Sequence, residues 1–156
     1  MTMVRIRPHH ILDILVLYGR DLPFKGNLSY THDQPRVAKQ ILSDIDQEVE
    51  LVLGPDDICR PCNHLQPDGL CDDIIPQADP PLSKQEYSDN LDRRLFSYLD
   101  IAPSAVKTVR EVYEIANSKM PDIADFCTHP GQEHEAILNG IKRGLSLLGI
   151  GDKGES

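Results

Sequence analysis

The spacing of apolar residues predicts a chain built mainly from helices. Pro8 suits the first turn of a helix, and an apolar stretch over residues 11–18 follows it until Gly19. We expect this first helix to be almost wholly buried. A second helix is predicted to begin near Pro35, with inward positions that recur at intervals of three and four residues: Val37, Ile41, Leu42 and Ile45.

One short strand is predicted after these helices. Residues 48–53 alternate between polar and apolar side chains, as in a half-buried strand, and Gly54-Pro55 ends it. The segment over residues 20–34 is rich in Gly, Pro, Asn, Ser and Asp, which predicts a connecting loop. Three apolar residues of this loop are expected to dock on the core: Phe24, Leu28 and Tyr30.

Four further helices are predicted in the second half of the chain. Ser83 is expected to cap the first of them, and Ser104 is expected to begin the next. A short helix is predicted over residues 121–126, and a last one from about Gln132 to the stop at Gly149 and Gly151. The inward positions of the three longer helices are Tyr87, Leu91, Leu95, Tyr98 and Leu99; Val106, Val109, Tyr113 and Ala116; and Ile137, Ile141, Leu145 and Leu148.

In residues 56–81 the apolar side chains follow neither the spacing of a helix nor the alternation of a strand. This stretch contains five prolines, one glycine and three of the four cysteines, so something other than packing must hold it. There is no internal repeat and no clear linker. We therefore expect a single domain over residues 1–151 with a frayed tail over 152–156. Its fold class is mainly α with a small β element, wrapped around an irregular cysteine-rich metal loop.

Composition and charge narrow the functional classes. The chain has 156 residues, 40% of them hydrophobic, the balance of one globular domain. Its net charge of −9 disfavours nucleic acid and anionic membranes as partners. The longest apolar run is far short of the roughly 20 residues that span a bilayer, and no export signal is evident. We expect a cytoplasmic protein with reduced cysteines.

The cysteines carry most of the chemical signal. Cys59, Cys62 and Cys71 have the spacing C-x2-C-x8-C, and the turn over residues 67–69 can bring Cys71 back toward the first pair. Such thiolates can bind one metal ion or the corners of a cluster. A tetrahedral zinc or a cubane cluster needs a fourth ligand. The candidates are Cys127, His64, His129, His134 and the group His9, His10 and Asp13.

Two other interpretations of these cysteines remain. They could be ordinary buried side chains, or Cys59 and Cys62 could form a redox dithiol, since Cys-x-Pro-Cys is a thioredoxin-like form. Pro67 and Gly69 follow too closely for the helix that a dithiol of this kind requires. Metal binding is therefore the favoured interpretation.

Two motifs give the chain a resemblance to a known family. The motif Arg7-Pro-His-His-Ile-Leu12, and residues 54–59 read as G-x-D-D-I-C followed by C-x2-C and G-x-C, resemble a family of small uncharacterised bacterial and archaeal proteins. The similarity covers mainly residues 5–75. Its members are regarded as iron–sulphur proteins without an established activity. The resemblance thus implies a ligand set and no reaction: Cys59, Cys62 and Cys71, with the pair His9 and His10.

The sequence also departs from this family. Members often have a cysteine directly after the histidine motif, where Asp13 stands here, and a second cysteine cluster near the C-terminus, of which Cys127 remains. Cys127 is thus the remaining thiolate that can complete a four-cysteine site, and we favour it as the fourth ligand. The expected cofactor is an iron–sulphur cluster, with zinc as the alternative.

The histidine pair allows a second kind of site. His9, His10 and Asp13 are three or four residues apart on the first predicted helix, so an imidazole and the carboxylate share a face. They could share a metal ion, or Asp13 could fix the tautomer of one imidazole. We favour the hydrogen bond, because a buried aspartate needs a partner. Asp56 and Asp57 are expected to be solvated or capping carboxylates.

Three functional classes follow from these residues. The favoured one is an iron–sulphur protein that transfers electrons to a redox partner protein or senses redox state. The second is an interaction module whose loop is held by zinc. The third is a metal-dependent enzyme that uses His9, His10 or Asp13 as acid, base or ligand. It is the weakest, because the sequence has no phosphate loop and no nucleophile elbow.

Overall fold

The computed structural model describes residues 3–21, 34–54, 56–57, 74–75, 82–127 and 133–150. Its helices are α1 (Pro8–Gly19), α2 (Gln34–Ser43), α3 (Lys84–Leu99), α4 (Val109–Ser118), α5 (Ile123–Cys127) and α6 (His134–Leu147). Its strands are β1 (Val4–Ile6), β2 (Glu48–Leu51), β3 (Ile74–Ile75), β4 (Leu82–Ser83) and β5 (Val106–Thr108). The predicted class, mostly helical with a small sheet in one domain, is confirmed.

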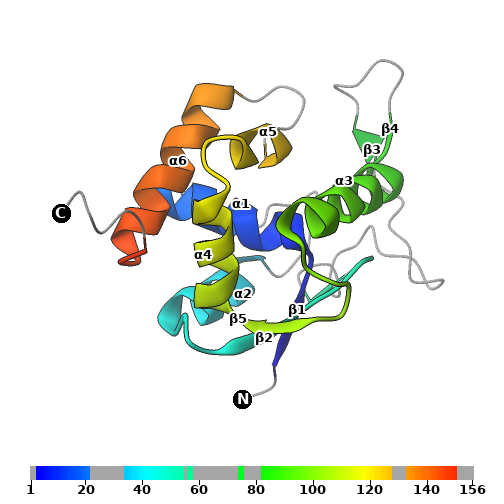
Figure 1. Cartoon of the computed structure of the whole chain (residues 1–156). Helices are drawn as coiled ribbons and strands as arrows, with labels where there is room; N and C mark the ends of the chain where they lie inside the picture. The colour runs from blue at the N-terminus through cyan, green and yellow to red at the C-terminus, as the bar shows by residue number, and fades with distance from the viewer. Residues whose placement is uncertain are drawn as a thin grey trace.

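Three strands that are far apart in the sequence form one sheet in the order β1-β2-β5 (Figure 1). β1 runs parallel to β2 with Val4 opposite Val49, and β5 runs antiparallel to β2 with Lys107 opposite Val49. A parallel pair needs a long crossover, and the chain between β1 and β2 includes α1 and α2. Successive side chains of a strand alternate between faces, so Val4, Ile6, Val49 and Leu51 all point into the core.

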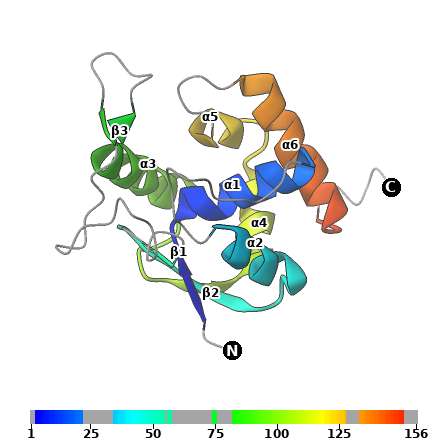
Figure 2. The same cartoon turned by 180° about the vertical axis from the view of Figure 1, so that it is seen from behind.

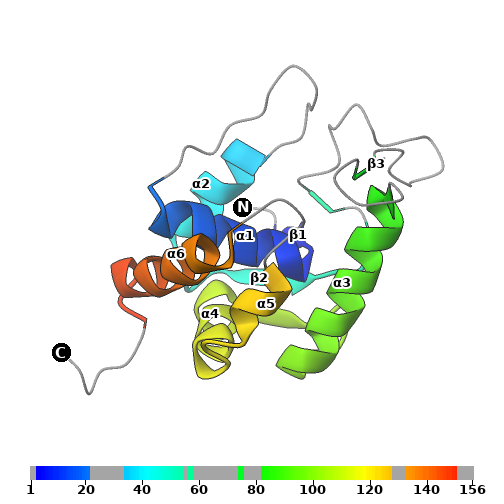
Figure 3. The same cartoon turned by 90° about the horizontal axis from the view of Figure 1, so that it is seen from above.

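Helix α1 lies at the centre of the molecule, between α3 and α6 (Figures 1 and 2). Most of its residues are buried, as the sequence predicts. It lies directly beside α6 (Figure 3). A Cβ atom on Gly19 would be 1.8 Å from the carbonyl oxygen of Gly140. A Cβ atom on Gly144 would be 2.5 Å from the carbonyl oxygen of Leu15. Glycine is therefore required along this contact.

Most of the other predicted helices are confirmed. α2, α3, α5 and α6 begin within about two residues of their predicted starts, the scatter usual for helix ends. The inward positions that are buried as predicted include Val37, Ile41, Leu91, Leu95, Leu99, Ile137, Ile141 and Leu145.

The prediction that a helix begins at Ser104 is wrong. Ser104 has a φ of 70°, residues 106–108 form β5, and Val106 is 47% exposed. The helix begins at Val109 because Thr108 caps it: Thr108 Oγ1 accepts from the Glu111 nitrogen at 3.0 Å, and Glu111 Oε1 accepts from the Thr108 nitrogen at 2.9 Å. A capping box thus separates strand from helix.

Several predicted features lie outside the described residues. These are most of the loop over 56–81, the docking residues Phe24, Leu28 and Tyr30, and the tail. Within that loop the structure describes residues 56–57 and β3, which pairs antiparallel with β4 directly before α3. No helix in the described ranges is long and apolar enough to cross a bilayer.

Candidate functional site

Carboxylates from other segments hold the first turn of α1. Arg7 is its N-cap residue and forms no capping bond through its own side chain. Instead, Asp92 of α3 accepts from the backbone nitrogen of His9 at 3.0 Å, and Asp56 accepts from that of Arg7 at 2.6 Å. Unpaired N–H groups give the start of a helix a partial positive charge, so both anions stabilise it.

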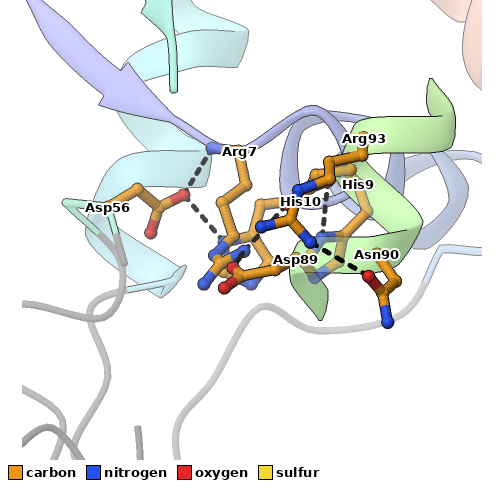
Figure 4. Close-up of polar contacts among 8 residues, drawn as sticks. Arg7, His9, His10, Asp56, Asp89, Asn90 and Arg93 are labelled. Carbon is orange, nitrogen blue, oxygen red and sulfur yellow. Dashed lines mark hydrogen bonds and ion pairs between the residues drawn. The ribbon is translucent and has the colours of Figure 1, made fainter. Parts of the chain in front are cut away.

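The guanidinium of Arg7 lies in the same buried cluster (Figure 4). Its Nη1 atom is 2.9 Å from Oδ1 of Asp89 and 2.9 Å from Oδ2 of Asp92. The Arg7 side chain is 3% exposed and that of Asp92 is fully buried. Burying a charge costs free energy unless it is paired, and these two ion pairs offset that cost.

His9 and His10 make the same kind of contact with two different carboxylates. Nδ1 of His9 is 2.9 Å from Oδ1 of Asp92, and Nδ1 of His10 is 2.8 Å from Oδ2 of Asp56. An ionised carboxylate can only accept, so each Nδ1 carries a proton and each neutral ring has its lone pair on Nε2. The ring centroids are 4.3 Å apart. Carboxylates behind imidazoles in this way are typical of metal-binding histidines.

The surroundings shift the two imidazole pKa values in opposite directions. Burial, followed by the charge of His10, lowers the pKa of His9 in spite of Asp92. Burial also acts to lower the pKa of His10, but Asp56 outweighs it and raises that pKa. Burial opposes ionisation of Asp56 as well, yet His10 and Arg7 hold the pKa of Asp56 well below its usual value. The lowered pKa keeps His9 neutral near pH 7. The shifts at His10 and Asp56 favour the charged form of each of these two side chains.

Residues 56–81, which include three cysteines, are called the cysteine segment below. Asp56 and Asp57 attach the start of this segment to β1. The Asp57 nitrogen donates to the Arg5 oxygen at 3.0 Å, and the Arg5 nitrogen donates to Oδ2 of Asp57 at 2.9 Å.

Of the two roles predicted for Asp56, solvated or capping, the solvated one is wrong, because Asp56 is 5% exposed and bonded to His10. Its bond to the backbone nitrogen of Arg7, the N-cap residue of α1, agrees with the capping role. Cys59 follows two residues after Asp57 in the sequence. The segment that carries three cysteines therefore leaves the described structure beside His10.

The carboxylates that orient the two imidazoles differ from the predicted one. Asp92 and Asp56 bond to the two Nδ1 atoms, whereas the sequence favoured Asp13. Asp13 is half-buried, and its charge acts to raise the pKa of both imidazoles, in line with its predicted place on their side of α1. The sequence did carry a signal for Asp92: it stands next to the core residue Leu91 and three residues before Leu95.

The predicted cysteine centre stays a prediction. Within the described ranges, no group of three or more His, Cys, Asp or Glu side chains could hold a metal ion. Cys127 ends α5, and its side chain is outside the described part. His134 begins α6, and its Nε2 is 2.8 Å from Oδ1 of the exposed Asp125. The remaining candidates lie outside the described residues: Cys59, Cys62, His64, Cys71 and His129.

Helix α5, which ends at Cys127, packs against α1 and also contacts α3. Asp92 of α3 faces the first turn of α1, and Phe126, the residue before Cys127, packs against α3 nearer its C-terminal end. The ring of Phe126 is 4.4 Å from that of Tyr98, and Arg94 Cζ is 5.1 Å from the Phe126 centroid.

One family model matches residues 27–130, more than half of the chain, and is described as a protein of unknown function (DUF1284). The chain belongs to this family. The DUF1284 match includes Asp56, Asp92 and all four cysteines, while β1 and α1 precede it. It confirms that the chain belongs to an uncharacterised family, while the histidine motif lies before the matched residues and iron–sulphur binding stays a prediction. No curated protein and no solved structure matches the chain.

Proposed function

We propose that this chain binds a metal centre through Cys59, Cys62 and Cys71. An iron–sulphur cluster is the favoured cofactor and zinc is the alternative, because both use thiolates at this spacing. With a cluster, the protein transfers electrons to a redox partner protein or senses redox state. With zinc, the centre instead holds the cysteine segment in one shape as an interaction surface.

One observation carries the proposal: the described fold buries charges where the cysteine segment begins. Asp56 bonds to His10 and to the backbone of Arg7. At the other end of the segment β4 leads into α3, which supplies Asp92 to the same cluster. Buried ion pairs are weak contributors to stability, and buried groups with shifted pKa values concentrate at functional sites. The cluster therefore supports a functional role for the adjoining segment.

Metal analysis and an absorption spectrum of anaerobically purified protein test the proposal. A cluster gives visible colour, iron and acid-labile sulphide, whereas zinc gives a colourless protein. Replacing Cys59, Cys62 or Cys71 by Ser should each lower bound metal sharply. Full metal content in all three single variants would contradict the proposal.

A second candidate function rests on the imidazole pair. Neighbouring groups whose pKa values are shifted apart are typical of acid–base catalysis, and His9 and His10 show such shifts. In a metal-dependent enzyme, neutral His9 would act as the base and charged His10 as the acid. Metal that is bound in full but shows no reversible reduction would favour this candidate, or the zinc module, over electron transfer.

A further inference from the structure

We propose that Asp92 is the positioning residue of an acid–base histidine, His9, and that Nε2 of His9 is the atom that takes and returns the proton. The inference rests on the second candidate function and deepens it. It assigns a role to a carboxylate of α3 that no sequence motif singles out, and it gives His9 a role other than that of a metal ligand.

The first argument is that three donors fix the carboxylate of Asp92. Its Oδ1 accepts from Nδ1 of His9 at 2.9 Å and from the backbone nitrogen of His9 at 3.0 Å. Its Oδ2 accepts from Nη1 of Arg7 at 2.9 Å. The Asp92 side chain is fully buried, so these hydrogen bonds are stronger than they would be in water. The carboxylate is therefore held in one orientation, and it keeps the proton of a neutral His9 on Nδ1.

The second argument is the location of the two residues. His9 lies in the first turn of α1 and Asp92 in the middle of α3, and these two helices contact each other. Groups on helices are held more precisely than groups on loops, and acid–base groups need precise placement. Asp56, which bonds to His10 in the same way, is outside the described helices and strands. His9 is therefore the more firmly oriented of the two imidazoles.

The third argument is the chemistry that this arrangement permits. A carboxylate that accepts from Nδ1 leaves the lone pair on Nε2, and it stabilises the imidazolium that forms when Nε2 takes a proton. In that step a substrate O–H or N–H group, or a water molecule, loses its proton, Nε2 gains it, and Asp92 stays ionised. Burial and the charge of His10 lower the pKa of His9, so the ring can accept a proton near pH 7.

NMR spectroscopy of the full-length protein with isotopically labelled histidine tests the inference. The expected wild-type spectrum shows His9 with its proton on Nδ1. Asp92→Ala removes the acceptor, so the proton should shift to Nε2, the tautomer that an unassisted histidine side chain prefers. Asp89→Ala is the matched control. Asp89 also pairs with Nη1 of Arg7 at 2.9 Å, but none of the described contacts joins it to His9, so the tautomer should not change.

Chemical modification separates a positioning role from a merely structural one. Diethyl pyrocarbonate reacts with an unprotonated imidazole nitrogen, and mass spectrometry locates the product. Asp92→Ala should slow the modification of His9 about 10-fold or more, because a ring in the wrong tautomer has no lone pair on Nε2. If Asp92 only held the fold, its loss would loosen the first turn of α1 and speed the modification. The exposed His134, which also has an aspartate partner, reports the activity of the reagent in both proteins.

Circular dichroism checks that each variant folds, and the wild-type spectrum decides the question if Asp92→Ala does not fold. Three results would each overturn the inference and leave the second candidate function intact: a wild-type His9 with its proton on Nε2, a proton that stays on Nδ1 in Asp92→Ala, or faster modification in that variant. Reversible reduction of the bound metal would instead contradict the candidate function, and with it the acid–base role of His9, even where the tautomer is as expected.

Discussion

The two ends of α1 are held by opposite kinds of interaction. Its C-terminal half packs on α6 with backbone against backbone, and glycines make this approach feasible. Its first turn is held by the buried charges of Arg7, Asp56 and Asp92. Close packing of this kind has a small desolvation cost, and the carbonyl oxygen of Gly19 at this end accepts from Arg143 Nη1 of α6 at 3.0 Å. Each buried charge at the first turn, in contrast, has a desolvation cost that its partners must offset.

The need for a stable fold explains the close packing at the C-terminal end of α1, but it does not explain the buried charges at the first turn. Replacing a buried ion pair by apolar residues of similar size is often neutral or stabilising. An apolar first turn could therefore hold α1 as well as the charged one does. Departures from the simplest stable solution are expected at functional sites, so the polar end of α1 is the end that we expect to have a function.

Breaking the charged end should have the largest effect. Arg7→Met removes the guanidinium from the buried Asp92 and from Asp89. Removing one partner of a buried pair leaves an uncompensated charge, which costs about 3–5 kcal/mol. We expect the free energy of unfolding, measured with urea, to fall by this amount.

Arg5 provides the matched control for Arg7. It lies two residues earlier on β1, its side chain is 51% exposed, and its Nε is 3.6 Å from Oε1 of Glu50. Exposed ion pairs contribute about 1 kcal/mol or less, so Arg5→Met should be nearly neutral. Equal losses in the two variants would mean that burial of charge does not distinguish this end of the helix.

Breaking the apolar end should have the next largest effect. Gly144→Ala places a Cβ atom 2.5 Å from the Leu15 oxygen, which is backbone and cannot rotate away. Overpacking of this kind costs about 1–3 kcal/mol. In a helix interior, alanine is otherwise more stabilising than glycine by about 1 kcal/mol. A decrease in the free energy of unfolding would therefore be due to the close contact and not to helix propensity.

The control for Gly144 is Ser146→Ala, at an exposed position of the same helix. It should change the free energy of unfolding by no more than about 0.5 kcal/mol. Stabilisation by Gly144→Ala would show that α1 and α6 can separate without loss.

Much of the fold could be predicted because apolar periodicity reports burial on helices directly. α1, α3 and α6 follow their predicted stripes closely. Strand β1 was missed because three residues are too few for an alternating pattern to be seen. β5 was read as helix because Val106 happens to fit the helical period of α4, although its side chain faces solvent.

The candidate site could be predicted only in part. His9 and His10 share one helix turn, so local spacing was enough to group them. Their carboxylate partners, Asp92 and Asp56, are 83 and 46 residues away along the chain. Pairing over such separations depends on how α3 and the segment after β2 dock on α1, which local patterns do not encode.

The smallest expected effect is a change in how the free energy of unfolding depends on pH, and it should occur only for a variant at the charged end of α1. Burial acts to raise the pKa of Asp92, but His9 and Arg7 outweigh it and hold that pKa below its usual value. The native state thus binds fewer protons than the unfolded state, and this carboxylate stabilises the fold above the unfolded pKa of about 3.9. Its contribution is lost as the pH falls through the folded-state pKa. Urea unfolding between about pH 5 and pH 2 should show Asp92→Asn less stable than wild type at the upper limit but with a shallower fall. Gly144→Ala should run parallel to wild type, because its Cβ atom meets only Leu15. Three parallel curves would mean that Asp92 does not stabilise the fold through its charge.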